Sequence, residues 1–345
     1  MGKEKIQEKN PRLGTAGGQA LIEGIMMNGP EGAALAVRKQ DGTITIVPKE
    51  FKHLRDKIKI FKLPILRGIV NFIESMVLGY KCLMESAELS GQLELEESEE
   101  EMSKLDRWIC DHFGKKMMAV ISAIAMVLGF ALAFVLFVYL PSFLIKTLDV
   151  YVLGEFLKAH AMRPLLEGII RIAIFIAYLA AVTNMKDIKR VFMYHGAEHK
   201  TIFCYEAGEE LTVENVRKYK RFHPRCGTSF MFIILIISIL MSSIVAVIFK
   251  QFDATAKILD IAWAWSLIKI LIMPLVMGIG YEILKYAGKH DNKIINALTA
   301  PGLWMQRLTT KEPDDSMIEV GIASLKAVIE KNKNSEQSDN ENAED

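Results

Sequence analysis

Four long apolar blocks constrain the fold of this chain more than any other feature. Hydrophobic residues make up 51% of its 345 positions, and they gather in blocks instead of being spread as in a single soluble core. The blocks cover residues 117–145, 165–182, 230–249 and 261–284. As helices they are long enough to cross the roughly 30 Å of hydrocarbon in a bilayer. We therefore predict an α-helical integral membrane protein with four transmembrane helices in contact with the lipid bilayer.

The distribution of lysine and arginine predicts how these helices are oriented. Basic residues are frequent just before the first block and between the second and third, and they are sparse in the other two connections. Cytoplasmic connections are the ones enriched in positive charge. We therefore expect a multi-pass protein of the cytoplasmic membrane with both termini in the cytoplasm. Its cysteines would then stay reduced, which argues against disulfides.

The remaining stretches differ in character. Residues 20–27, 33–37 and 43–47 are separated by turn signals and predict a three-stranded β-meander. Residues 64–87 carry charges at helical spacing among apolar residues. This pattern predicts an amphipathic helix that either lies on the membrane or packs on the β-module. A glutamate-rich run at 94–101 predicts a solvated linker.

These patterns divide the chain into segments. We expect a disordered N-terminus (1–13), a small cytoplasmic β-rich module (14–60), an amphipathic membrane-associated helix (61–90), an acidic linker (91–104), the first two transmembrane helices (105–185), a cytoplasmic loop (186–229), the last two transmembrane helices (230–287), a C-terminal segment with a helix at 317–329 (288–331) and a disordered acidic tail (332–345). Within the loop we expect a helix over 185–199, a strand over 201–205 and a helix whose N-cap is Thr212.

The loop at 186–229 contains a motif that points to chemistry. His195 and His199 are four residues apart, so they would share one face of the predicted helix. With Glu198 they follow the H-x-x-E-H order of the inverted zinc-hydrolase signature. In such sites the histidines bind the metal and the glutamate is a general base that takes a proton from water. We assign His195 and His199 as metal ligands and Glu198 as the catalytic residue.

The same loop offers further donors. Three of the seven histidines and two of the four cysteines fall between His195 and Cys226. Cys226 is the first choice for a third ligand and His223 the second, because nitrogen and sulfur donors suit zinc. Four protein ligands would make a closed structural site, whereas three would leave a position for catalysis, and both alternatives stay open. Histidines that bond to headgroups or backbone are the alternative without a metal.

Two charged residues outside the loop are candidates for supporting the site from a second shell. If the strand predicted at 201–205 pairs with the β-module, the module caps the loop and Glu23 can face the site. Lys269 lies inside the fourth apolar block, where an ionised group is costly. We expect Lys269 either to pair with Glu167 or Glu282 or to take part in function.

Charge and helix number exclude or disfavour two classes of function. The formal net charge is only +1, which argues against nucleic acid as a partner. A transporter is also disfavoured, because four helices with one clear central charge make a poor permeation path.

Four motifs together resemble a known family. They are GGQALIEGIMM at 17–27, YHGAEHK at 194–200, HPRCGTS at 223–229 and QRLTTKEPDD at 306–315. The resemblance extends over about residues 14–331 and is to the YqhQ family of bacterial multi-pass membrane proteins. It implies a metal-dependent protein of the bacterial membrane without naming a substrate. It also implies that the first motif matters as a unit with the histidine loop.

The leading interpretation is therefore a membrane protein with a cytoplasmic zinc site that acts as a metal-dependent hydrolase. The alternative is a non-enzymatic scaffold or regulator of other membrane proteins, in which a structural zinc site folds the loop. The soluble inverted zinc peptidases share only H-x-x-E-H with this chain, so peptidase activity does not follow from the motif.

Overall fold

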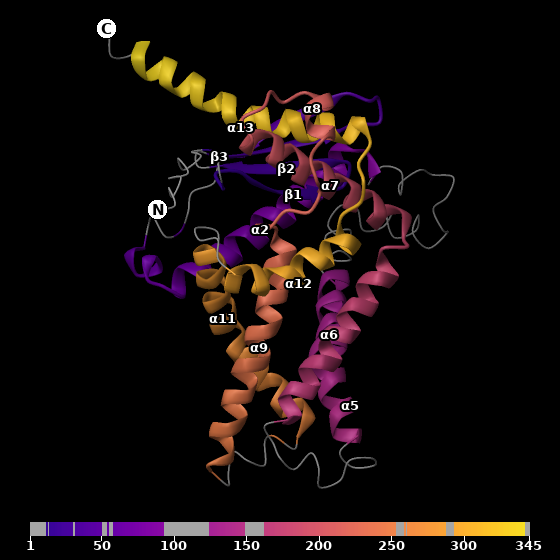
Figure 1. Cartoon of the computed structure of the whole chain (residues 1–345), viewed down its shortest axis with the longest axis vertical. Helices are drawn as coiled ribbons and strands as arrows, with labels where there is room; N and C mark the ends of the chain where they lie inside the picture. The colour runs from indigo at the N-terminus through magenta and orange to yellow at the C-terminus, as the bar shows by residue number, and fades with distance from the viewer. Residues whose placement is uncertain are drawn as a thin grey trace, which may run out of the picture.

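The fold has an upper body of sheet and helices above a lower bundle of long helices (Figure 1). The computed structural model describes residues 12, 14–29, 32–49, 54, 58–92, 124–148, 162–252, 259, 261–287 and 293–341. Most of the predicted N-terminal tail, most of the acidic linker and the first residues of the first apolar block lie outside the described residues.

The bundle contains the predicted apolar helices. Four of the described helices are long and apolar enough to cross a membrane, namely Ile124–Leu148, Pro164–Val182, Phe230–Lys250 and Trp263–Ile283. The first includes the π-helix η2 (Val135–Tyr139) and α5 (Leu140–Leu148). The others belong to α6 (Met162–Val182), α9 (Gly227–Lys250) and α11 (Ala262–Ala287). The prediction of a mostly helical chain with four such helices is confirmed.

One polar cluster joins all four apolar helices. Lys269 on α11 donates hydrogen bonds to Glu167 on α6 and to Ser142 on α5. Arg171 on α6 donates to Glu167 at 2.9 Å and to Ser238 on α9 at 3.4 Å. Charges buried among apolar helices need such partners, because their removal from water is costly. Of the two partners predicted for Lys269, the structure thus selects Glu167.

The β-module is a four-stranded antiparallel sheet. Its strands lie in the order β1 (Gly17–Leu21), β2 (Gly24–Gly29), β3 (Gly32–Arg38) and β4 (Ile44–Lys49). The three-stranded prediction was wrong because residues 20–27 are not one strand. The chain reverses at Glu23, whose φ of 49° lies in the left-handed region, and Gly24 begins the next strand.

Helices cover both faces of the sheet (Figure 1). On one face Met26 packs with Cys82 of α2 (Leu66–Leu89). On the other face Met27 packs with Tyr194 of α7 (Lys186–Glu206) and with Met317 of α13 (Asp315–Glu341). Neighbouring residues of a strand point to opposite faces, so one strand contributes to both layers. The amphipathic helix predicted at 64–87 therefore does pack on the β-module.

Three helices complete the upper body. The predicted helix over 185–199 is the first part of α7, but α7 continues to Glu206, so the strand predicted at 201–205 was wrong. A short apolar run fits a buried helix as well as a strand, and here Ile202 and Cys204 continue the buried face of α7. The predicted cap is confirmed, because the Thr212 hydroxyl accepts the Asn215 N–H at the start of α8 (Val213–Arg217).

The C-terminal segment folds back over the molecule. Helix α12 (Lys293–Thr309) crosses above the bundle and α13 returns over the sheet (Figure 1). Helix α13 continues to Glu341, into the segment 332–345 for which the sequence predicted disorder. Extending a helix that is already formed adds a hydrogen bond for each residue, which favours continuation in a polar sequence.

Ser324 fastens α13 to the sheet, which generates a first prediction. The buried Ser324 hydroxyl accepts the Met27 N–H at 3.1 Å and donates to the Ala34 carbonyl at 2.8 Å. Ser324→Ala would leave both backbone groups without this partner, at a cost of about 2 kcal/mol. We expect a lower midpoint of thermal unfolding for the detergent-solubilised variant.

Ser86→Ala is the matched control, because the Ser86 hydroxyl is also buried but donates only within its own helix, to the Leu83 carbonyl. Equal midpoints for the two variants would contradict the role assigned to Ser324.

Candidate metal centre

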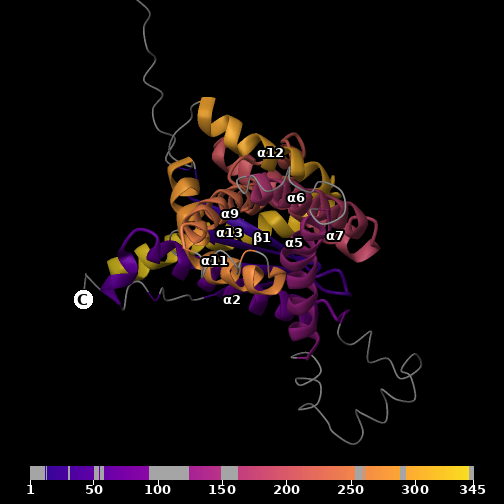
Figure 2. The same ribbon diagram turned by 90° about the horizontal axis from the view of Figure 1, so that it is seen from below.

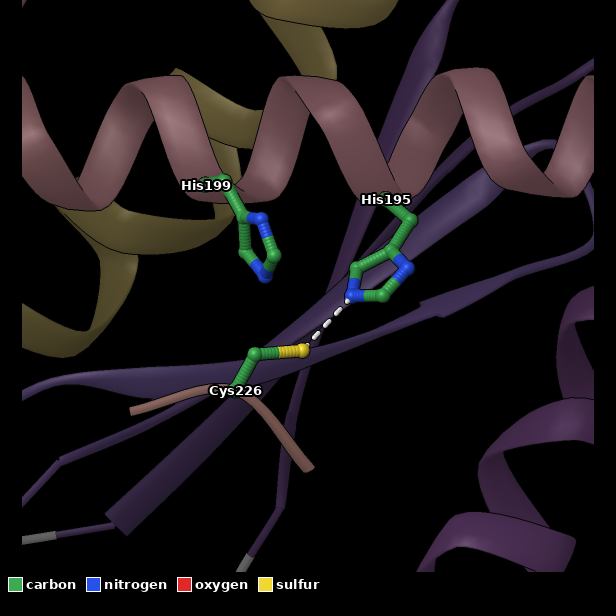
Figure 3. Close-up of side chains that lie close together, drawn as sticks. All are labelled: His195, His199 and Cys226. Carbon is green, nitrogen blue, oxygen red and sulfur yellow. Dashed lines mark hydrogen bonds between the residues drawn. The ribbon is translucent and has the colours of Figure 1, made fainter. Parts of the chain in front are cut away.

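Helix α7 places the predicted ligands. Its buried residues Ala197 and Ile202 pack into the core that α7 shares with the sheet and α13. Residues four positions apart share a helix face, so His195 and His199 project together from another side of α7 (Figure 3). Gly196 allows the chain after α12 to approach, because a Cβ there would collide with the Lys311 carbonyl.

Three of the predicted ligands come together. One nitrogen each from His195 and His199 and the sulfur of Cys226 all lie within 4.8 Å of one another (Figure 3). The His195 Nε2 is 3.2 Å from the Cys226 Sγ. Cys226 is the N-cap of α9, so the cluster connects α7 to the beginning of an apolar helix. His199 and Cys226 are buried and His195 is partly exposed.

The outer nitrogens of both imidazoles bind backbone carbonyls. The His195 Nδ1 lies 2.8 Å from the Thr309 carbonyl oxygen, and the His199 Nδ1 contacts the Arg221 carbonyl. A carbonyl can only accept a hydrogen bond, so in a neutral imidazole each Nδ1 carries the proton and each Nε2 keeps its lone pair. Histidine ligands of metals are usually oriented in this way.

The His199 Nε2 is the observation that most favours a metal. It is buried, and among the described residues no donor satisfies it. Burial lowers the pKa of His199 and so favours the neutral imidazole, while the nearby Cys226 thiol acts on the pKa in the opposite direction. An unsatisfied buried polar atom is destabilising, and a bound cation would remove that cost. Two imidazole nitrogens and a thiolate are also donors that zinc prefers, so the residues present fit the predicted ion.

His223 is not part of the three-donor group. Its Nδ1 accepts the Arg225 N–H at 3.3 Å, and its Nε2 lies 3.6 Å from the Glu206 carboxylate. The ring therefore uses both nitrogens within its own surroundings. The backbone of His223 has a different role, because Gln306 accepts its N–H and donates to its carbonyl, both at 2.7 Å. This pair of hydrogen bonds fixes the turn that leads to Cys226.

Glu198 lies between α7 and the first strand of the sheet. It is almost fully buried, and burial raises its pKa to about 6, although His195 and the Gly18 N–H act in the opposite direction. A Cβ at residue 18 would lie 3.0 Å from the Glu198 Cγ, so glycine makes room for this carboxylate. A pKa near neutrality suits a general base. The first sequence motif thus touches the histidine motif directly.

The two predicted supporting residues have other partners. Glu23 binds Arg190 at 2.6 Å and the Tyr194 hydroxyl at 3.1 Å, so it fastens the β1–β2 turn to α7. Lys269 lies in the polar cluster between the apolar helices. The sequence did not predict the roles of Thr309, Arg221 and Gln306. Thr309 and Arg221 contact the imidazoles through backbone carbonyls, which every residue has, and Gln306 acts on a distant turn. Only the motif at 306–315 marked this region.

The Gln306 clamp generates a second prediction. Gln306→Ala removes both hydrogen bonds that hold the His223 backbone, so the turn before Cys226 should open more often. We expect Cys226 in chelator-treated protein to be alkylated about tenfold faster, equivalent to ~1.4 kcal/mol in the opening equilibrium. Peptide mapping would measure the rate for each cysteine separately.

Thr310→Val is the control, because the buried Thr310 hydroxyl, directly after α12, donates to the backbone carbonyl of Gln306 and not to the His223 backbone. If both variants react as slowly as the wild type, the clamp does not hold the turn.

Comparison with known proteins places the chain in a family. Residues 63–331 match the family described as "Protein of unknown function (DUF1385)". The chain is 33% identical over 322 residues to "Uncharacterized protein YqhQ" of Bacillus subtilis (strain 168), an alignment that covers 93% of this chain and 94% of that protein. No solved structure matches the chain. The length and extent of these matches show that the chain belongs to the YqhQ family.

Proposed function

We propose that the four apolar helices cross the cytoplasmic membrane and that the sheet and its covering helices lie on the cytoplasmic side. Support comes from the length and composition of the helices. Basic residues mark the proposed cytoplasmic end, where Lys186, Lys189 and Arg190 stand at the start of α7, directly after α6. The connections at the other end, 149–161 and 253–258, each contain a single lysine in the sequence.

We further propose that His195, His199 and Cys226 bind one zinc ion. The observation that carries this proposal is a pair of imidazoles whose Nδ1 atoms face backbone carbonyls. The buried Nε2 of His199 has no hydrogen-bond partner among the described residues, and the Cys226 sulfur lies close by. The ion would also hold α7 against the start of α9.

A metal-dependent hydrolase is the function that this arrangement supports best. Three protein donors are the number found in catalytic zinc sites, which keep one position open. Bound zinc would supply Lewis acidity for the attack of water on a substrate. Glu198 would accept a proton from that water, in keeping with its raised pKa and with the electrostatic influence of His195 on its carboxylate. The Thr309 and Arg221 carbonyls would keep the imidazoles in position.

A structural zinc site is the second candidate. The burial of His199 and Cys226 favours it, as does the place of Cys226 at the beginning of α9. In this case zinc would fasten the upper body to the bundle, and the chain would act as a scaffold or regulator of other membrane proteins. Glu198 would then be a packing residue against Gly18.

The metal content of purified protein is the third prediction. We expect one zinc per chain in the wild type and in Glu198→Gln and His223→Gln, and loss of zinc in His199→Ala. Elemental analysis measures these values. In protein loaded with cobalt, Cys226→Ser should lose the sulfur-to-cobalt charge-transfer absorption. No metal in well-folded wild type, or an unchanged spectrum in Cys226→Ser, would contradict the proposed ligands.

The effect of Glu198→Gln on turnover is the fourth prediction and separates the two candidates. A hydrolase should lose activity by about 10²–10⁴-fold on ester, phosphoester or amide substrates while its zinc content is unchanged. With a structural site, Glu198→Gln should leave the zinc content and the amount of protein in the membrane unchanged. Cys226→Ala should then lower the amount of protein in the membrane. Full activity in Glu198→Gln would exclude the glutamate as general base.

A further inference from the structure

Helix α2 has one face buried against the sheet and another that is exposed. Its inner face is buried against the sheet, where Cys82 packs in the core and Gly79 leaves room for the Gln19 side chain. Its outer face is apolar but exposed. The outer face consists of Ile73, Met76, Val77, Tyr80 and Met84, each exposed by 38% to 55%. Their spacing places them on one stripe of the helix.

Exposed apolar residues are also found just before α2 in the chain. The 3₁₀ helix η1 (Lys59–Lys62) precedes it, and Ile58, Ile60 and Leu63 beside or within η1 are also exposed. A helix that faces water normally has its polar residues outward, and apolar patches of this kind mark a binding surface. We call the exposed apolar residues of η1 and of the outer face of α2 together the α2 surface.

The first half of α2 is attached to the upper end of α11. Gly68 lies against Gly278, where a Cβ would come within 3.1 Å of its Cα. Arg67 forms an ion pair with Glu282, and Asn71 donates to the Tyr281 hydroxyl at 2.8 Å.

These α11 residues lie at the end of the apolar span Trp263–Ile283 that is nearest the sheet. Seen from below the bundle, α2 runs beside α11 at the edge (Figure 2). If α11 spans the membrane, α2 begins at the height of the membrane surface.

Four lysines lie on the elements that form or adjoin the α2 surface. Lys59 and Lys62 belong to η1, Lys81 to α2 and Lys285 to the last turn of α11, and all four are exposed. Basic residues next to an apolar helix face complement anionic lipid headgroups.

We propose that the α2 surface is immersed in the boundary between headgroups and acyl chains of the cytoplasmic leaflet, so that anionic lipid is its partner. This inference rests on the proposed membrane insertion of α11 but not on the metal site. It follows that the sheet stands directly on the membrane. Because Glu198 packs on Gly18 of that sheet, the His195–His199–Cys226 cluster is also held at a fixed height above the lipid.

Spin labels in reconstituted vesicles test the proposal. The full-length protein carrying Cys110→Ser is labelled at Met76→Cys, and the three other cysteines are buried. Vesicles contain phosphatidylethanolamine and phosphatidylglycerol. Collision rates with oxygen, which prefers lipid, and with a water-soluble nickel complex report the environment. We expect a several-fold higher oxygen-to-nickel ratio at Met76 than at Glu319→Cys, whose side chain is half exposed on α13.

Leu271→Cys provides the control for insertion, because Leu271, exposed by 74%, is the most exposed of the large hydrophobic residues described in α11. A lipid environment at Leu271 with a water environment at Met76 would overturn the α2 proposal alone. Water environments at both positions would overturn membrane insertion as well. Low collision rates with both reagents at Met76, together with dipolar broadening between labels, would assign the surface to a second copy of the chain and so also overturn the lipid proposal.

Discussion

The hydrogen bonds from the two imidazoles to the carbonyls of Thr309 and Arg221 determine what the centre of this molecule can do. They fix the tautomers, so both Nε2 lone pairs lie beside the Cys226 sulfur. Without them either ring could rotate and satisfy its nitrogens elsewhere. Among the described residues, the arrangement instead leaves the His199 Nε2 buried without a hydrogen-bond partner, which costs stability that a bound cation would restore.

Segments far apart in sequence are needed to maintain those two hydrogen bonds. Gln306 fixes the turn before Cys226, and Gly196 lets the chain after α12 lie against α7. Glu198 also packs on Gly18 of β1, and Ser324 fastens α13 to the sheet. The four sequence motifs are therefore parts of one packed unit, although about 280 residues separate the first from the last.

The sequence predicted the features that depend on spacing within a short segment. Apolar blocks gave the four long helices, and the i, i+4 spacing placed His195 and His199 on one face. The sequence did not predict features that depend on a contact with a residue far away in the chain. The reversal at Glu23 is stabilised by Arg190 and Tyr194, and the ring of His223 is engaged by Glu206. No local pattern contains these contacts, and the roles of the metal and of Glu198 stay predictions.

The proposed centre would be mechanically coupled to the apolar bundle. Helix α7 begins at Lys186, shortly after α6 ends at Val182, and Cys226 caps α9 itself. Two donors thus extend from one long helix and the third from another. Zinc bonds to nitrogen and sulfur are about 2.0–2.3 Å long and tolerate little variation. A relative shift of α6 and α9 by one or two ångströms would therefore break the site, so occupancy by metal and the arrangement of the bundle should depend on each other.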